Sequence, residues 1–300
     1  MERISSLIDS LAVKLPFHGE YLRSSIQRMT DEEKRSFERL LAFYMNAGHT
    51  IESLTRDYSR FFKDVMKERA YFQKHHQYRH HTLAEVADSI YHDPNYMDMY
   101  MIGLSLSIYV WEEAFEIHRW FIQQIRGRTG QRYLEVGPGH GENFVKAMEL
   151  SHYESYEALD LSQTSLDATR AYAQYALPDK DNISYTLGDF LQYSNTRRYD
   201  AMIIGEVLEH VERPDAFLKQ VCALADKDTF IYISTAINSP AIDHIYQFHN
   251  QEEVFQLVRE NGLVVMDYCY VPTIESVDAE DYPSADLGMV LRCETEGVLL

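Results

Sequence analysis

The sequence predicts an α/β fold in which an all-helical region precedes a parallel sheet with helices on both of its faces. Two observations lead to this prediction. The first half of the chain has only two prolines and shows apolar residues at helical spacing. The second half alternates short apolar runs with amphipathic stretches, which is typical of parallel sheets. We therefore expect a helical domain over residues 1–127 and an α/β domain over residues 128–300, divided at the basic turn Arg126–Gly130.

Capping patterns and apolar spacing place the helices of the first half. Thr30–Glu33 and Thr82–Glu85 both fit a capping box, in which a threonine and a glutamate satisfy free N–H groups at the start of a helix. The helix that begins after Thr30 is expected to end near Gly48. Another is expected after Thr50, because apolar residues recur there three and four positions apart. One or two more are expected between Tyr96 and Ile125.

Short apolar runs mark the strands of the second half, and helical stretches such as 166–176 and 214–224 lie between some of them. Two last runs, Leu263–Val271 and Leu287–Cys293, have no helix-length segment between them. We expect these two to form an antiparallel pair at one edge of the sheet. The five earlier predicted strands are Arg132–Val136, Tyr156–Leu161, Ile183–Leu187, Ala201–Gly205 and Phe230–Ser234.

The chain is strongly acidic, with 28 Lys and Arg against 47 Asp and Glu and a net charge of −19. This charge repels nucleic-acid phosphates and anionic membrane surfaces, so neither is an expected partner. No apolar stretch is long enough to span a bilayer. The three cysteines form no CxxC pair, so a disulfide framework is not expected. Because no leader peptide is recognisable at the start of the chain, we expect a cytoplasmic location.

The segment Glu135–Glu142 places three alternate glycines directly after a predicted strand and before a predicted helix. Glycine is needed where the chain turns sharply and a ligand lies against the backbone. The spacing of Gly137, Gly139 and Gly141 differs from the G-x-G-x-x-G fingerprint of a pyrophosphate site. Glu135 precedes the first glycine by two residues. Its charge would repel a pyrophosphate and would suit a cationic ligand, such as one with an ammonium and a sulfonium group.

Polar residues end the next strands at positions where a nucleoside can be bound. Asp160, after the second strand, can accept both hydroxyls of a ribose. After the third strand, Asp189 can accept from an adenine amino group and Phe190 can pack beside the ring. Gly205 and Glu206 end the fourth strand at the same edge of the sheet. The competing interpretation is local, because an aspartate at such positions can also cap a helix or stabilise a turn.

In this order and spacing, the motifs of residues 132–294 resemble the class I S-adenosylmethionine-dependent methyltransferases, including the quinone-type enzymes that act on small molecules. The resemblance implies a Rossmann-like sheet of seven strands with an antiparallel final strand, and S-adenosyl-L-methionine as the cofactor. It also implies a set of cofactor-binding residues, namely Glu135, Gly137, Gly139, Gly141, Asp160, Leu161, Asp189, Phe190, Gly205 and Glu206.

A cluster of acidic and histidine residues follows the fourth and fifth strands. Glu206, Glu209 and His210 come after the fourth strand, and His244 and His249 come after the fifth. Because these strand ends are neighbours in such a fold, the side chains can converge beside the reactive carbon. His210 or His244 can act as a general base, with Glu206 and Glu209 as further catalytic candidates.

Two other interpretations of this cluster remain open. The E-x-x-E-H pattern is similar to that of small-RNA 2′-O-methyltransferases, in which Glu206, Glu209, His210 and His244 would correspond to divalent metal ligands. The pattern also occurs in relatives where part of it serves packing. We expect no metal cofactor.

The helical half holds nine of the 22 tyrosines and both tryptophans. In related enzymes such a region covers the ligand edge and excludes water, and we expect the same here. Tyr91, Tyr96, Tyr100 and His249 are the candidate substrate contacts. Homodimerisation through these helices is the alternative role.

The expected activity is methyl transfer from S-adenosylmethionine to an oxygen or nitrogen of a small molecule, in small-molecule biosynthesis. The competing activity uses the aminocarboxypropyl chain of the same cofactor. That chain would either cyclise to a small cyclic amino acid or pass to an amine, and methylthioadenosine would be released.

Overall fold

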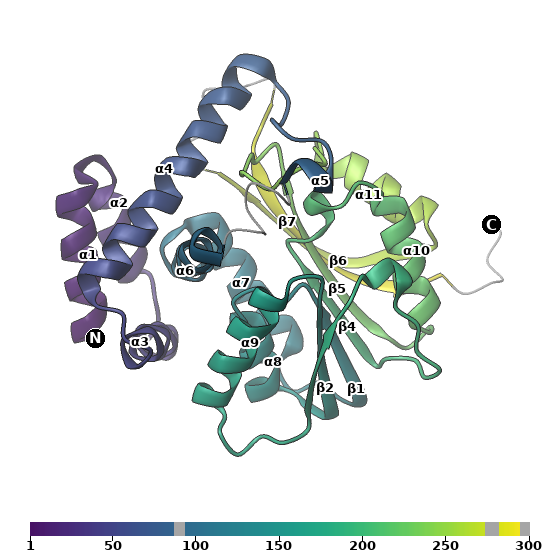
Figure 1. Cartoon of the computed structure of the whole chain (residues 1–300). Helices are drawn as coiled ribbons and strands as arrows, with labels where there is room; N and C mark the ends of the chain where they lie inside the picture. The colour runs from purple at the N-terminus through teal and green to yellow at the C-terminus, as the bar shows by residue number, and fades with distance from the viewer. Residues whose placement is uncertain (87–93, 274–281, 295–300) are drawn as a thin grey trace.

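The computed structural model describes residues 1–86, 94–273 and 282–294, and it packs a group of helices against an α/β layer (Figure 1). In the helical group, α4 packs along both α1 and α6. The elements before the sheet are α1 (Glu2–Lys14), η1 (Pro16–His18), α2 (Gly19–Gln27), α3 (Asp31–Asn46), α4 (Ile51–His75), α5 (Leu83–Val86), α6 (Pro94–Val110) and α7 (Glu112–Ile125).

Capping residues begin these helices where the sequence predicted them. The N–H of Glu33 donates to Thr30 Oγ1 at 3.3 Å, and the N–H of Thr30 donates to the Glu33 carboxylate at 2.6 Å. Thr82 and Glu85 make the same exchange at the start of α5. The predicted helical stretch between Tyr96 and Ile125 forms two helices, because Trp111 has an extended backbone that separates α6 from α7. No helix within the described ranges is long and apolar enough to cross a membrane.

A seven-stranded sheet forms the second layer, and its strand order is β3-β2-β1-β4-β5-β7-β6. The first five strands are parallel, whereas β7 is antiparallel to both of its neighbours. This confirms the predicted sheet and its antiparallel edge pair. The strands are β1 (Thr129–Val136), β2 (His152–Asp160), β3 (Ile183–Leu187), β4 (Ala201–Gly205), β5 (Phe230–Ile237), β6 (Leu263–Pro272) and β7 (Ala285–Cys293). The connecting helices are α8 (Glu142–Leu150), α9 (Gln163–Ala176), η3 (Phe190–Gln192), η4 (Leu208–His210), α10 (Pro214–Leu224) and α11 (Gln251–Glu260).

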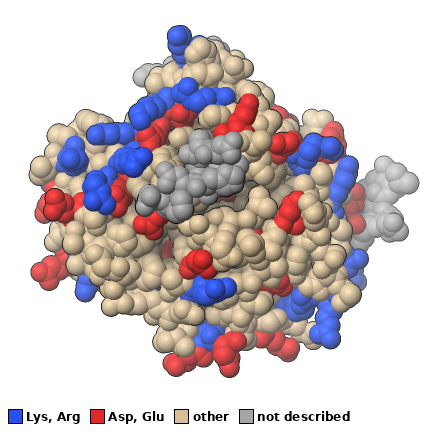
Figure 2. Space-filling model, viewed as in Figure 1, with Lys and Arg blue, Asp and Glu red and all other residues tan. Residues whose placement is uncertain are grey.

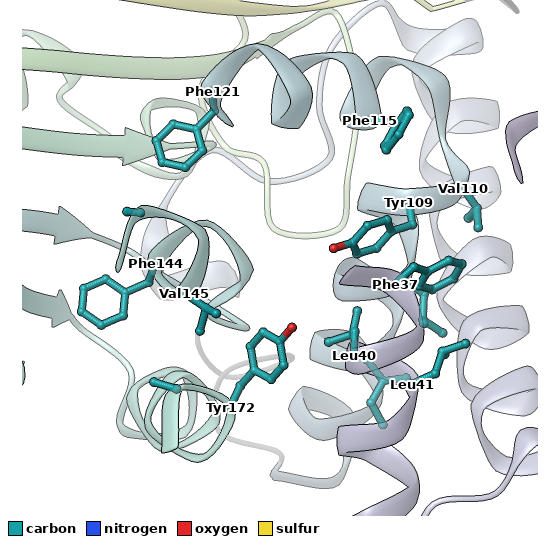
Figure 3. Close-up of a cluster of buried hydrophobic side chains, with 14 of the residues drawn as sticks. Phe37, Leu40, Leu41, Tyr109, Val110, Phe115, Phe121, Phe144, Val145 and Tyr172 are labelled. Atoms are coloured by element: carbon teal, nitrogen blue, oxygen red, sulfur yellow. The ribbon is translucent and has the colours of Figure 1, made fainter. Parts of the chain in front are cut away.

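One buried apolar cluster joins the helical group to one face of the sheet (Figure 3). Phe37 of α3 stacks on Tyr109 of α6, with ring centroids 4.6 Å apart. Phe43 of α3 packs against Tyr172 of α9 at 5.1 Å. Burial of aromatic side chains contributes strongly to stability, because each removes a large apolar area from water. The division at residues 127 and 128 stays a prediction, since this cluster includes residues from both sides of it.

Buried polar contacts reinforce the same junction. Arg39 of α3 forms an ion pair with Glu149 of α8 through two guanidinium nitrogens. Lys146 of α8 donates to Ser36 Oγ of α3 at 2.6 Å. Paired geometry of this kind fixes one orientation of the helices, since leaving either charge buried without its partner would be costly. The helical group is therefore held in a defined position over α8.

Candidate functional site

The candidate site lies at the carboxyl ends of the parallel strands. The strand register pairs Val136 of β1 with Leu159 of β2 and with Ile204 of β4, and Ile204 pairs with Ile233 of β5. The residues that follow these positions are Gly137, Asp160, Gly205 and Ser234, so they form a row across the sheet. Ligands of open α/β sheets bind in the crevice at this edge. Figure 2 shows a hollow near the centre of the face viewed in Figure 1, with side chains of both charges around it.

The glycine loop has the backbone that its sequence predicts. Gly137, Gly139 and Gly141 have φ values of +68°, +57° and +85°, in the left-handed region that favours glycine. A Cβ atom at Gly137 would lie 2.7 Å from Val207 Cγ2, and one at Gly141 would lie 2.9 Å from Thr169 Cα. At Gly139 it would meet no atom of the described ranges within 4 Å. The middle glycine therefore faces open space, whereas the outer two are closely packed.

Glu135 lies behind this loop. Its side chain is only 3% exposed, and its carboxylate accepts a hydrogen bond from Tyr133 at 2.5 Å. Burial raises the Glu135 pKa to about 8, although the Tyr133 hydrogen bond opposes this shift. The carboxyl group therefore carries a proton at neutral pH for most of the time. Its expected role toward a cationic ligand stays a prediction.

Asp160 ends β2 and borders the glycine loop. Its Oδ1 accepts the N–H of Ser162 at 2.8 Å. Burial raises the Asp160 pKa to about 6, although hydrogen bonds from backbone N–H groups, including that of Gly139, favour the charged form. The neighbouring Leu161 is 57% exposed and makes an apolar surface beside the carboxylate. An apolar group next to an acceptor suits a nucleoside, which has both a hydroxylated sugar and a flat ring.

Asp189 and Phe190 have local partners. Asp189 Oδ1 accepts the N–H of Leu191 at 2.9 Å, and Oδ2 accepts from Gln192 at 3.0 Å, so the side chain caps η3. The Phe190 ring is buried against Phe217, with centroids 4.5 Å apart. The predicted contacts of both residues with an adenine ring therefore stay predictions.

Glu206, which follows Gly205 at the end of β4, has a strained backbone. Its φ of +53° is unfavourable for a residue with a side chain, and such strain concentrates at functional sites. The Glu206 N–H donates to the backbone oxygen of Ser234 at 3.0 Å, which holds this conformation. Its side chain is accessible to solvent although protein atoms crowd around it, as expected for a group that lines a concave site.

Glu209 and Glu206 influence each other. Glu209 is fully buried; its Oε2 accepts from Thr235 at 2.7 Å, while its Oε1 has no donor among the described residues. Burial raises the Glu209 pKa to about 7. The protein atoms that crowd around Glu206 displace part of its water, and this desolvation together with the nearby charge of Glu209 raises the Glu206 pKa well above its ordinary value. A proton or another cation between the two carboxylates would relieve their repulsion.

The two histidines have matching orientations. His210 Nδ1 lies 3.0 Å from the backbone oxygen of Asp243, and His244 Nδ1 lies 2.7 Å from that of Ser239. A carbonyl oxygen only accepts, so each Nδ1 carries a hydrogen, and in the neutral form of either ring Nε2 has the lone pair. The two rings meet at right angles, with centroids 4.8 Å apart. Burial lowers the His244 pKa to about 3, so this ring stays neutral.

Glu209, His210 and His244 could hold a metal ion. One potential ligand atom from each lies within 4.8 Å of the others. Histidine ligands usually donate their second ring N–H to a carbonyl or carboxylate, which is the arrangement of both rings here. A carboxylate with two imidazoles suits divalent ions such as Zn²⁺ or Mn²⁺. Of the four predicted metal candidates, the structure thus groups these three.

The predicted substrate contacts have different surroundings. The Tyr100 hydroxyl donates to Asp243 Oδ1 at 2.6 Å and so reaches the cluster from α6. Tyr96 instead donates to Asp64 of α4 at 3.1 Å. His249 is exposed and pairs with Glu253 of α11, so the structure does not bring it to the cluster. Tyr91 lies outside the described residues.

Sequence analysis missed three buried residues at this site. Asp243 is 4% exposed, and its Oδ2 lies 3.6 Å from His210 Nδ1. Its position directly before His244 was a usable signal. Asp286 is a single acid in the apolar run of β7, and burial together with Glu206 raises its pKa. The third, Tyr78, lies between α4 and α5 in the chain. No sequence pattern marked it as a site residue, because only the tertiary fold brings it to this cluster.

Comparison with known proteins defines the class. A family model described as a methyltransferase domain matches residues 110–268, more than half of the chain, and the chain belongs to this family. Together with the fold, this makes it a class I S-adenosylmethionine-dependent methyltransferase. Its cofactor is S-adenosylmethionine. The matched region runs from the end of α6 to the middle of β6.

The individual relatives share only a low sequence identity with this chain. The mitochondrial ubiquinone biosynthesis O-methyltransferase of Candida albicans is 28% identical over 57% of this chain and 50% of its own length. The (S)-tetrahydroprotoberberine N-methyltransferase of Eschscholzia californica is 19% identical over 47% of this chain and 40% of its own. The chain thus spans about half the length of the curated relatives it matches. Phosphoethanolamine N-methyltransferase 2 of Haemonchus contortus, a solved structure, shares the fold with a TM-score of 0.54 at 11% identity, over 71% of this chain and 60% of that one.

Proposed function

We propose that the protein transfers a methyl group to an oxygen or nitrogen of a small molecule, with His210 as the general base. The observation that supports this most is the orientation of the His210 ring. Its Nδ1 faces the backbone oxygen of Asp243, and its Nε2 lies 4.0 Å from Glu209 Oε1, next to the row of strand ends. Relatives named as O- and N-methyltransferases support both kinds of acceptor atom. The acidic chain disfavours nucleic acid as the acceptor.

The residues at the strand ends fit S-adenosylmethionine. Open space against Gly139 leaves room for a ligand on the backbone, and the Asp160 carboxylate beside it can accept from a ribose. Gly205 and the accessible Glu206 would lie at the methionine end, where a carboxylate can attract the ammonium group. When bound, the cofactor supplies a methyl group on a positively charged sulfur, which needs little activation. The protein's own tasks are to align the acceptor, exclude water and accept a proton.

Asp243 and Tyr100 support His210 as the base. Nδ1–H points at the backbone oxygen of Asp243, and the Asp243 carboxylate lies 3.6 Å away, where it can stabilise the imidazolium that forms. Tyr100 donates to that carboxylate and fixes its position. The low pKa of His244 makes it a poor proton acceptor at neutral pH, which favours His210.

A divalent cation on Glu209, His210 and His244 is the second candidate, favoured by the three converging ligand atoms. Such an ion would lower the pKa of an acceptor hydroxyl, and His210 would then be a ligand and not a base. A homodimer through the helical half stays a prediction.

Mass spectrometry of the nucleoside product tests the proposed function. The purified protein is incubated with S-adenosylmethionine, with and without a metabolite extract. We expect S-adenosylhomocysteine to form only with the extract, together with one component heavier by a methyl group. If methylthioadenosine forms faster than it does without protein, the aminocarboxypropyl chemistry replaces this proposal.

A further inference from the structure

Tyr78 is far in sequence from the strand ends, yet its ring is buried beside the acidic and histidine cluster. Only 2% of the residue is exposed. The ring meets His244 edge-on, with centroids 5.8 Å apart, and packs against Phe72 of α4 at the same distance. The backbone of Ser239 lies against its hydroxyl, and the charges of Glu209, Asp286 and Glu206 are near enough to raise the Tyr78 pKa. The helical half therefore places a phenol at the site of the expected chemistry.

The Tyr78 hydroxyl is buried, and its hydrogen has no acceptor among the residues that the structure describes, whereas the backbone N–H of Ser239 faces its oxygen. Buried hydroxyl groups are nearly always paired, so the hydrogen of this hydroxyl is available to an acceptor atom of a bound ligand. Oε1 of Glu209 is also buried, and no residue in the described part of the chain donates to it. Since the charge of Glu209 acts on the Tyr78 hydroxyl and neither group has a partner of the right kind among the described residues, a single ligand group could satisfy both.

The chemistry of this donor restricts the ligand. A metal ion or an ammonium group has no lone pair that could accept the Tyr78 hydrogen. A neutral amine has one lone pair, which it needs for attack on the methyl carbon. A hydroxyl oxygen has two lone pairs, so it can attack with one and accept from Tyr78 with the other. Its own hydrogen can be directed to Glu209 or His210.

We propose that Tyr78 recognises the acceptor by donating a hydrogen bond to the hydroxyl oxygen that is methylated, so that the protein is an O-methyltransferase. This inference rests on the proposed function. The hydroxyl proton passes to His210 Nε2, an oxygen lone pair forms the new C–O bond, and the electron pair of the broken C–S bond stays on sulfur. Tyr78 keeps its proton throughout. Its hydrogen bond is directed at the oxygen whose charge changes, as in other preorganised sites.

Two variants test this role. Tyr78→Phe removes only the hydroxyl. Tyr185→Phe is the matched control. The Tyr185 hydroxyl of β3 is also buried and has no partner where the structure describes the chain, but its ring packs near Phe144, away from the cluster. Wild type and both variants receive S-adenosylmethionine with a trideuterated methyl group and a metabolite extract. The rate of product formation, the site of the label and the affinity for S-adenosylhomocysteine by calorimetry are measured.

We expect the wild-type label on an oxygen. Tyr78→Phe should lower kcat/KM by about 10- to 100-fold, with S-adenosylhomocysteine affinity unchanged within twofold, and Tyr185→Phe should keep the wild-type rate. A labelled nitrogen in the wild-type product overturns the inference without any variant. A wild-type rate in Tyr78→Phe also overturns it. Absence of S-adenosylhomocysteine with the extract would instead count against the proposed function itself.

Discussion

The hydroxyl of Tyr100 lies 2.6 Å from Oδ1 of Asp243, and this hydrogen bond links a helix of the first half to the loop after β5. Asp243 in turn faces His210 with both its backbone oxygen and its carboxylate. Tyr100, which precedes the sheet in sequence, thus orients His210 through one intervening residue, Asp243. The helical half therefore does more than cover the site, because it positions a group within it.

Tyr100→Phe should reduce the turnover number by about tenfold, since Asp243 would lose the donor that fixes it and His210 would be less well oriented. The affinity for S-adenosylhomocysteine should stay within twofold, because Tyr100 is not among the predicted cofactor contacts. Tyr44→Phe is the control, since it removes a buried hydroxyl bonded to Ser105 in the helical half. Steady-state kinetics and calorimetry on both variants check this. An unchanged turnover number in Tyr100→Phe would show that Asp243 needs no such support.

Two glycines of the loop allow a paired prediction about the cofactor. Gly139→Ala would place a methyl group in open space where the cofactor is expected, whereas Gly141→Ala would press against Thr169 at 2.9 Å. Both have a left-handed backbone, so both variants carry a strain of about 1 kcal/mol. We expect Gly139→Ala to weaken S-adenosylhomocysteine binding at least tenfold with a small decrease in Tm. Gly141→Ala should lower Tm by more. If Gly139→Ala binds as wild type does, the cofactor does not lie against this glycine.

The fold could be predicted because its signals are local. Strand-helix alternation, the capping boxes at Thr30 and Thr82 and the antiparallel pairing of the last two strands each follow from signals in neighbouring residues, and the structure confirms them. The conformation of the glycine loop could be predicted equally well, because the left-handed backbone at Gly137 is unfavourable for most other residue types.

The site could be predicted only in part, because its completion depends on tertiary packing. Glu206, Glu209 and His210 are close in sequence, and the parallel sheet brings His244 to them as expected. Nothing local distinguishes Tyr78 from the other tyrosines of the helical half, or shows that Tyr96 bonds to Asp64 while Tyr100 reaches Asp243. Likewise, nothing local shows that the Phe190 ring packs on Phe217. Such choices depend on which face of a helix or loop meets the sheet.

Removal of metal distinguishes the two candidate roles of His210. Under the proposed function, dialysis against EDTA should leave the methyl-transfer rate within twofold of its starting value, because His210 accepts the proton without help. A loss of activity that Mn²⁺ or Zn²⁺ restores would establish the metal site instead. Calorimetric titration of the same ions into wild type and His244→Asn provides a readout apart from activity. A metal site predicts binding that the variant weakens at least tenfold, since one of three converging ligands is lost.

The buried Glu135 should make stability depend on pH in a defined direction. Its folded-state pKa of about 8 lies above the ordinary 4.5, so between these values the folded protein binds more protons than the unfolded chain. The free energy of unfolding therefore falls as pH rises from 4.5 to 8, and each unit of pKa is worth about 1.4 kcal/mol. Glu135→Gln stays neutral at every pH, and its amide oxygen can still accept from Tyr133.

Between pH 5 and pH 8.5, the Tm of Glu135→Gln should accordingly rise relative to wild type by about 5–10 °C. Other buried acids, such as Glu209, titrate in both proteins, so their contribution cancels in this difference. Glu154→Gln makes the same chemical change at an exposed position of β2 and should show no pH-dependent difference from wild type. Thermal unfolding of the three proteins across this range checks the prediction. A constant Tm difference between Glu135→Gln and wild type would mean that Glu135 is already ionised in the folded protein, and its charge would then be available to a cationic ligand after all.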